Sequence, residues 1–478
     1  MNATQVVFPN WEPVAPSQIC GGSYLWRLIC FQYRSKKRFG VSYALPGVRP
    51  LTECFLQTTT IESPEASSLP AQLPQTIEDA MTVCTQLELP YLWIDRYCIP
   101  QSDLQERLRQ IRHMDIIYSH AFLTLIACAG DDPYHGLSGV RNARQPYPSI
   151  RLGDCGIFQM IENEGFVSTS TWASRGWTFQ EAVLSVRRLY FTERQLIFES
   201  SNTLESETTS LSAAPKLPSG AFIYSLEAMA ENSESIYNCI SLFTGRSLSE
   251  PDDILKAMLG IFSVFERKFT IRQVWGLPFS NAMFAPNTAT SLLWIGPSSS
   301  IRRRGFPSWS WTGWECKVYW RDFVTSEQAD DIDVSLELCS GLLISLDDYQ
   351  NYYESANFGA GQLSIYIHID AYVTPVMFRG HDANAPASVN LSLPKMGGES
   401  LHWSFPNDSA PIVTDQLLAL HLTPWRYSVG TAPHDHTNIE DILLIGYMSD
   451  HWERIKIIHE FAGRLMGLKM TRQTIRLG

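Results

Sequence analysis

The sequence predicts an α/β fold for the N-terminal half of the chain, with a parallel sheet flanked by helices in a flavodoxin-like arrangement. Apolar runs and helical patterns alternate between Thr76 and Glu199, which is typical of strands joined by crossover helices. A helical pattern continues from Gly220 to Arg267. Short β-like runs then predict a mostly-β C-terminal region, at 342–346, 363–373, 417–422 and 442–448.

A helix and a short buried strand open the predicted sheet. Apolar residues recur at helical spacing over 76–87, which predicts an amphipathic helix. The run Tyr91-Leu-Trp-Ile then leads into Asp95 and a loop closed by Pro100. A short apolar run of this kind predicts a buried parallel strand, and ligands of α/β sheets bind at the carboxyl ends of such strands.

The next elements continue the alternation. Ser102 and Gln105 form a capping box with Ser102 as the N-cap, which predicts a helix that runs on to Ala121. The remaining predicted elements are a strand over 122–129, a helix over 172–184 and a strand over 188–199.

The length of the chain predicts more than one domain. At 478 residues, two or three domains are expected. The polar, Ser-, Thr- and Pro-rich stretch 200–220 predicts the first boundary. We therefore expect an α/β domain over 1–205, a helical and aromatic extension over 206–330, and a β-rich region over 331–478.

Charge argues against a nucleic-acid partner. The net charge is −12, whereas nucleic-acid-binding proteins usually present a basic face. The basic run Arg302–Arg304 is predicted to be a solvated turn. The Trp309, Trp311 and Trp314 cluster could be a ligand platform, but packing of a strand against a neighbouring domain is the favoured interpretation.

Cysteine and hydrophobicity patterns indicate a soluble cytoplasmic protein. The ten cysteines are scattered without a C-x-x-C pair, which is typical of reduced thiols and not of a disulfide framework or a zinc site. His434 and His436 resemble half of a metal site, but no third ligand is suggested, so no metal is expected. No signal pattern opens the sequence, and no apolar stretch is long enough to span a bilayer.

Common enzyme motifs are missing from the sequence. It contains no Walker A loop, no dinucleotide-binding Gly-rich turn, no G-x-S-x-G and no H-E-x-x-H. These enzyme classes are therefore disfavoured, and no resident cofactor is expected.

Several blocks resemble the fungal heterokaryon-incompatibility (HET) domain. They are Pro74-Gln-Thr-Ile-Glu-Asp-Ala80 leading into Tyr91–Gln101, the helix that carries Glu106 and Tyr118, Arg175–Ser185, and the flanking segments Asp252–Gly260 and Phe306–Trp314. The resemblance departs at the front, where only Tyr43-Ala-Leu45 of the usual first strand is recognisable and Pro46-Gly47 follows.

The resemblance implies a role in fungal non-self recognition, in which incompatible cell fusions end in programmed cell death. It also implies a homo-oligomer or a protein partner in that signalling. HET domains look distantly similar to Toll/interleukin-1-receptor (TIR) domains, some of which cleave NAD with a Trp-Cys-x-x-Glu motif. Trp177-Thr-Phe-Gln-Glu181 has the same spacing, with Thr in place of Cys.

This analogy makes Glu181 the candidate catalytic residue and NAD the candidate substrate. On one continuous helix Ser174, Trp177 and Glu181 would share a face, and the first two would contact the ligand. Cleavage of the nicotinamide–ribose bond builds positive charge on the ribose, which a carboxylate could stabilise. Alternatively, Glu181 pairs with an arginine such as Arg175 or Arg188.

Asp95 also has two interpretations. It could contact a ribose hydroxyl at the carboxyl end of its strand, or its carboxylate could cap the loop at Tyr97–Cys98 or the helix near Ser102. Cys98 is expected to be inert. Arg96, Gln101 and Glu106 are candidates for a polar rim, with solvated side chains as the alternative. A non-enzymatic recognition or signalling module therefore remains the rival to the enzyme.

Overall fold

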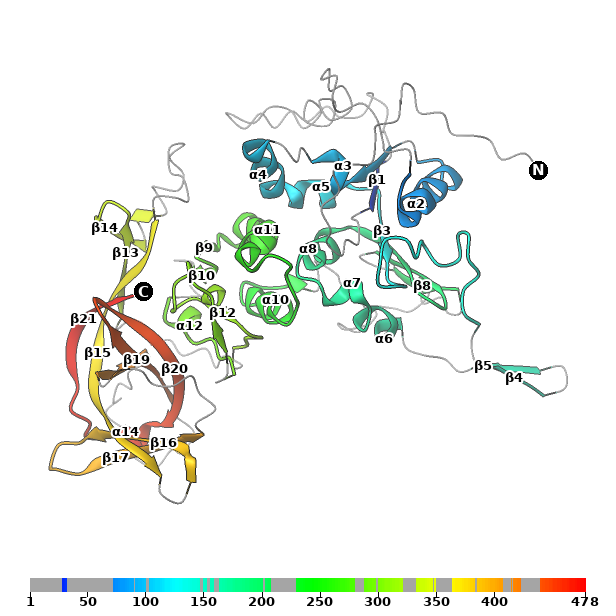
Figure 1. Ribbon diagram of the computed structural model, residues 1–478. Helices are drawn as coiled ribbons and strands as arrows, with labels where there is room; N and C mark the ends of the chain where they lie inside the picture. Colours follow the sequence, from blue (N-terminus) through cyan, green and yellow to red (C-terminus); the bar gives the residue numbers. More distant parts are fainter. Residues whose placement is uncertain are drawn as a thin grey trace, which may run out of the picture. The chain divides into compact units, whose positions relative to one another are not determined.

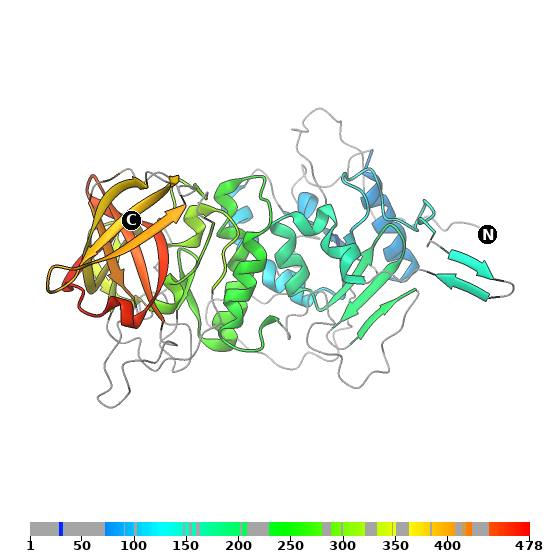
Figure 2. The ribbon, with the colours of Figure 1, turned by 90° about the horizontal axis from the view of Figure 1, so that it is seen from below.

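The computed structural model divides into two compact units (Figures 1 and 2), Met1–Met229 with Leu259–Ile261, and Ala230–Met258 with Phe262–Gly478. It describes residues 28–31, 72–89, 91–99, 103–146, 149–152, 155–158, 163–200, 203–207, 229–279, 288–297, 300–320, 332–346, 348–349, 363–382, 385–406, 414, 416–422 and 439–478. The predicted front strand at Tyr43–Leu45, the residues Gln101 and Ser102, and the pair His434 and His436 lie outside the described residues.

A six-stranded sheet forms the centre of the first unit, in the order β2-β1-β3-β6-β7-β8. Only β3 and β6 pair in parallel; the other neighbours are antiparallel. The strands are β1 (Leu28–Phe31), β2 (Tyr91–Ile94), β3 (Leu123–Ala127), β6 (Arg187–Phe191), β7 (Leu196–Ser200) and β8 (Thr203–Ser206). A separate hairpin joins β4 (Ser149–Leu152) and β5 (Cys155–Phe158).

The prediction of a parallel sheet is therefore wrong for most pairs of neighbouring strands in this sheet, which are antiparallel. The predicted strand 188–199 is a hairpin, because the polar residues between Phe191 and Leu196 turn the chain and the Thr192 N–H donates to the Gln195 carbonyl at 3.2 Å. Such short turns connect only antiparallel strands. Likewise β2 pairs with β1 alone among the described strands, and Tyr91 is 44% exposed. An apolar run does not reveal the direction of its partner.

Helices of the first unit begin close to their predicted positions but break more often. Helix α2 (Gln75–Gln86) matches its prediction. One turn, α3 (Asp95–Cys98), replaces the predicted loop. The helix predicted to run to Ala121 is split at His113 into α4 (Leu104–Arg112) and α5 (Met114–His120). The remaining helices are α6 (Asn163–Ser168), α7 (Thr171–Ser174) and α8 (Trp177–Leu184).

The predicted N-cap of α4 is also corrected. Asp103, not Ser102, is the N-cap, and its Oδ1 accepts hydrogen bonds from the N–H groups of Gln105 and Glu106 at 2.9 and 3.0 Å. A carboxylate is favoured at this place because it also interacts with the positive end of the helix dipole.

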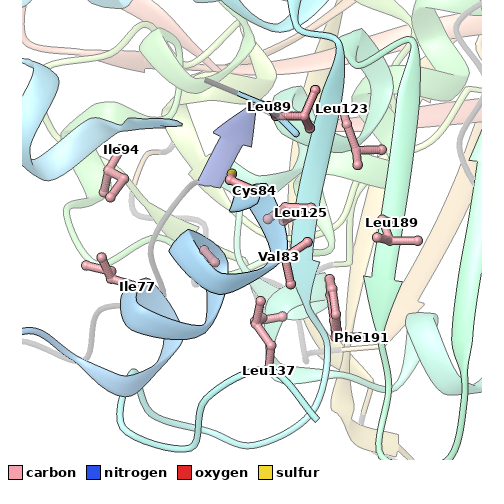
Figure 3. Packing of buried hydrophobic residues seen from close by; sticks show 12 residues of the cluster. Ile77, Val83, Cys84, Leu89, Ile94, Leu123, Leu125, Leu137, Leu189 and Phe191 are labelled. Atoms are coloured by element: carbon pink, nitrogen blue, oxygen red, sulfur yellow. The ribbon is translucent and has the colours of Figure 1, made fainter. Parts of the chain in front are cut away.

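Two hydrophobic clusters lie on opposite faces of the first sheet. Residues at odd positions of β3 and β6, such as Leu125 and Leu189, pack with α2 (Figure 3). Residues at even positions, such as Ile126 and Tyr190, pack with α7 and α8. The two-residue period of a strand therefore separates an apolar face from a face that also carries polar side chains.

The second unit begins with helices and short hairpins. Its helices are α10 (Ser235–Thr244), α11 (Leu259–Phe269), which contributes to both units, and α12 (Thr288–Leu292). Within the predicted helical pattern 220–267, two 3-10 turns, η1 (Pro251–Asp253) and η2 (Lys256–Met258), precede α11. The short strands are β9 (Arg272–Val274), β10 (Leu277–Phe279), β11 (Ile301–Arg302) and β12 (Trp314–Glu315).

A nine-stranded sheet confirms the mostly-β C-terminal region. Five of its strands form a closed ring of pairings, β15-β18-β19-β20-β21-β15. The elements are β13 (Asp333–Leu338), β14 (Leu343–Ser345), β15 (Leu363–Asp382), β16 (Ala385–Pro394), β17 (Ser400–Pro406), β18 (Leu417–His421), β19 (Ile439–Met448), β20 (His451–Phe461), α14 (Ala462–Leu465) and β21 (Thr471–Leu477).

The tryptophan cluster packs inside the second unit. Trp309 and Trp311 are 1% and 0% exposed, and their indole N–H groups donate to the carbonyls of Ile365 and Gly276 at 3.0 and 2.7 Å. Trp311 lies in the 3-10 turn η3 (Trp311–Gly313), not in a strand. The two residues are therefore packed, as the favoured interpretation expects, but they pack within one compact unit and not as a strand against a neighbouring domain.

The basic run beside the cluster is not a solvated turn. Arg303 is 8% exposed and donates to the carbonyls of Thr312 and Trp314 at 2.7 and 2.9 Å. The guanidinium of Arg302 lies 5.6 Å from the Trp314 ring centroid. Only Arg304 is exposed. The run is not solvated because the carbonyls at the end of η3 and just after it lack donors within the turn, and the arginines supply these donors.

Candidate functional site

The carboxyl ends of three strands meet at one edge of the first sheet. Since β1 is antiparallel to both β2 and β3, and β3 is parallel to β6, the strands β2, β3 and β6 run in the same direction. The segments that follow them are α3, the loop 128–139 and the turn 192–195. In α/β sheets such an edge binds ligands, so these segments frame the candidate site.

Asp95 opens the helical turn α3 at this edge. Its Oδ1 accepts from the Arg96 N–H at 2.7 Å, and its carbonyl accepts from the Ile99 N–H at 3.0 Å. These contacts favour the interpretation in which Asp95 shapes the chain after β2. Its predicted ligand contact stays a prediction.

Cys98 and Glu106 lie on the same stretch. Burial raises the pKa of the Cys98 thiol to about 11, and its Sγ accepts from the Ile94 N–H at 3.3 Å. A thiol in this state is a weak nucleophile at neutral pH. Glu106 forms a surface ion pair with Arg109 at 2.6 Å, and hydrogen bonding by this arginine lowers the pKa of Glu106.

Asp79 organises the loop after β3, and sequence reasoning missed it. It is 2% exposed, and its carboxylate accepts from the Leu137 N–H at 2.8 Å and pairs with the Arg141 Nε at 3.1 Å. Gly136 has φ +83°, and a Cβ there would lie 2.5 Å from Asp79 Oδ2. A carboxylate on the apolar face of α2 was the signal in the sequence, because buried charges need partners.

Glu181 is buried against α7 at the carboxyl end of β3. It is 1% exposed, and its Oε1 accepts from the Trp172 indole N–H at 3.1 Å. Trp172 is itself 2% exposed and meets the Tyr190 ring edge-on, with centroids 6.0 Å apart. Burial and the nearby charge of Glu181 raise the pKa of Cys128, which directly follows β3.

Ser174 and Trp177 do not share a helix with each other. Arg175 between them has extended backbone angles, φ −90° and ψ 138°, so α7 ends at Ser174 and α8 begins at Trp177. Ser174 is exposed and its hydroxyl donates to the Thr171 carbonyl at 2.8 Å, while Trp177 is half-buried. The expectation of one helical face is therefore wrong, and the ligand roles of both residues stay predictions.

A second buried carboxylate, Glu199, forms an ion pair with Arg188, which the sequence offered as a partner for Glu181. Arg188 Nε lies 2.9 Å from Glu199 Oε2, and the two side chains are 1% and 0% exposed. The Tyr190 hydroxyl donates to the same oxygen at 2.6 Å. Arg188 also donates to the carbonyls of Ala182 and Ser185, and thus caps the C-terminal end of α8. Charged residues within apolar strand runs were the signal for this pair.

Comparison with known families gives one match, within the first unit. Residues 48–181 match the family model described as heterokaryon incompatibility protein (HET). The chain therefore carries a HET domain, which includes α2, the loop after β3 and Glu181, and the match ends before β6. No curated protein and no solved structure matches the chain.

Two absences hold for the part of the chain that the structure describes. Within that part, no helix is both long and apolar enough to cross a membrane. Over the same residues, no group of three or more His, Cys, Asp or Glu side chains is arranged to hold a metal ion.

Proposed function

We propose that the chain is a cytoplasmic incompatibility protein that triggers programmed cell death after non-self contact. The HET domain suggests the incompatibility role. We further propose that this domain acts as a recognition and signalling module, through assembly with itself or with a protein partner.

The burial of Glu181 supports a module over an enzyme. A catalytic carboxylate must touch its substrate, yet this side chain is 1% exposed and hydrogen-bonded to Trp172. Its neighbours form a packed cluster with Ile126, Val167 and Tyr190. A buried carboxylate with such a partner serves to fix α8 against α7.

Induced expression in a fungal host tests this proposal. Growth and cellular NAD are followed after induction of wild type, Glu181→Gln and an empty control. Gln keeps the shape and the acceptor for Trp172, so the variant should fold and stop growth as wild type does, with NAD constant until growth ends. If NAD falls first and Glu181→Gln prevents both effects while accumulating to the same level, the module proposal is wrong.

NAD hydrolysis of the TIR type is the second candidate. It is favoured by the charge interaction of Glu181 with Cys128, the residue that directly follows β3, because ligands bind at the carboxyl ends of such strands. The spacing Trp177-Thr-Phe-Gln-Glu181 also supports it. In this case α7 would have to move before substrate could reach the carboxylate.

A further inference from the structure

Helix α7 is a single turn with an extended residue at each end. Ser170 before it has φ −71° and ψ 151°, and Arg175 after it has φ −90° and ψ 138°. Changes in a few such terminal residues are sufficient to move a short element as a rigid piece. These two extended residues are the positions at which the turn α7, labelled in Figure 1, could pivot.

The outer side of α7 is tied to the loop after β3 by one exposed hydrogen bond. The Thr171 hydroxyl donates to Asp131 Oδ1. Asp131 is exposed and Thr171 is half-buried. Solvent can replace both partners of this bond, so its loss leaves no buried polar group unpaired.

The inner side of the same turn covers a carboxylate. Trp172, the residue after Thr171, donates its indole N–H to Glu181 Oε1 at 3.1 Å, and both residues are almost completely buried. The Trp172 carbonyl also accepts from the Thr178 hydroxyl of α8 at 2.6 Å. A movement of α7 that carries Trp172 outward would break both bonds and expose Glu181. Rotation of α7 at the surface would thus control whether a ligand can reach the Glu181 carboxylate.

We propose that α7 is a lid over Glu181, latched to the loop after β3 by the Thr171–Asp131 hydrogen bond. The closed state dominates because Trp172 is buried. The open state presents the Glu181 carboxylate to a cationic ligand at the carboxyl end of β3. The proposed movement applies equally if the domain acts by assembly or by NAD hydrolysis.

Carboxylate labelling of the full-length protein tests the lid. A water-soluble carbodiimide with glycine ethyl ester converts accessible carboxylates to amides, which peptide mass spectrometry quantifies residue by residue. When reclosing is faster than labelling, the labelling rate of Glu181 follows the open population. Thr171→Val, which removes the hydroxyl but keeps the shape, should raise this rate about 3- to 10-fold, as should Asp131→Ala.

Two controls separate lid opening from loss of structure. Thr171→Ser keeps the hydroxyl and should label Glu181 at the wild-type rate. Glu199 is equally buried in the same unit but is held by Arg188 and Tyr190, so its rate should not change in any variant. An unchanged Glu181 rate in Thr171→Val and Asp131→Ala, or equal increases at Glu181 and Glu199, would overturn the proposal.

Discussion

At the scale of single residues, the first unit is organised by buried charges with specific partners. Asp79 holds the loop after β3, and Glu199 holds Arg188, which caps α8. The sequence shows that such residues interrupt apolar runs. It does not show their partners, because Arg188 and Glu199 meet only after the β6–β7 turn forms. For this reason the sequence offered Arg188 as a partner of Glu181 and did not indicate its pairing with Glu199.

The Arg188–Glu199 pair predicts a large and non-additive stability effect. Arg188→Met leaves Glu199 charged and buried, so the unfolding free energy of the first unit should fall by about 3–5 kcal/mol. Adding Glu199→Gln removes the stranded charge and should recover part of the loss. Urea unfolding followed by tryptophan fluorescence measures both.

A surface pair provides the matched control. Arg109→Met breaks the exposed Arg109–Glu106 pair and should cost less than about 1 kcal/mol. Equal losses for Arg109→Met and Arg188→Met would contradict the assigned importance of the buried pair.

At the scale of elements, periodicity predicted which segments are helices and strands better than where they end. Helix α2 matches its pattern because Ile77, Ala80, Val83 and Cys84 recur at helical spacing and are all buried. Breaks at His113 and Arg175 were missed, since neither residue is a strong helix breaker by type. The sheet edge near Asp95 could be expected from sequence, but the inserted antiparallel strand β1 could not.

The corrected cap of α4 makes a prediction for this helix. Asp103→Ala removes an acceptor from the N–H groups of Gln105 and Glu106, so stability should fall by about 1 kcal/mol. Asp103→Asn keeps the acceptor and should lose much less. Thermal unfolding at low salt measures the difference, and equal midpoints for all three proteins would show that Asp103 is not the cap.

At the scale of the whole molecule, the compact units place residues 230–258 with the β-rich region. The predicted domains 1–205, 206–330 and 331–478 remain a proposal. Within the second unit, Glu337 of β13 connects to Arg476 of β21 and His368 of β15 at 2.8 Å each. The Glu337 carboxylate thus ties three strands of the C-terminal sheet together.

This cluster predicts how stability depends on acid. Hydrogen bonding by Arg476 lowers the pKa of Glu337 from 4.5 to about 2. Because the pKa of Glu337 is lower in the folded than in the unfolded protein, its ionised form stabilises the fold at pH values above the unfolded pKa. This stabilisation is lost as the pH falls through the folded pKa of about 2. The melting temperature of wild type should therefore exceed that of Glu337→Gln at pH 6, and the gap should shrink between pH 4.5 and 2.

An exposed residue of the same unit serves as the control. Glu399→Gln should have the same melting temperature as wild type throughout this range, because Glu399 is exposed. A constant gap between wild type and Glu337→Gln down to pH 2 would contradict the ionic contribution of Glu337.

We propose that Glu181 holds α7 and α8 together and does not cleave NAD. The most direct test is to incubate the purified full-length protein with NAD, at concentrations high enough for self-assembly, and to measure released nicotinamide. We predict that wild type and Glu181→Gln both release no more than buffer. Nicotinamide release by wild type that Glu181→Gln abolishes, with an unchanged melting temperature, would contradict the account.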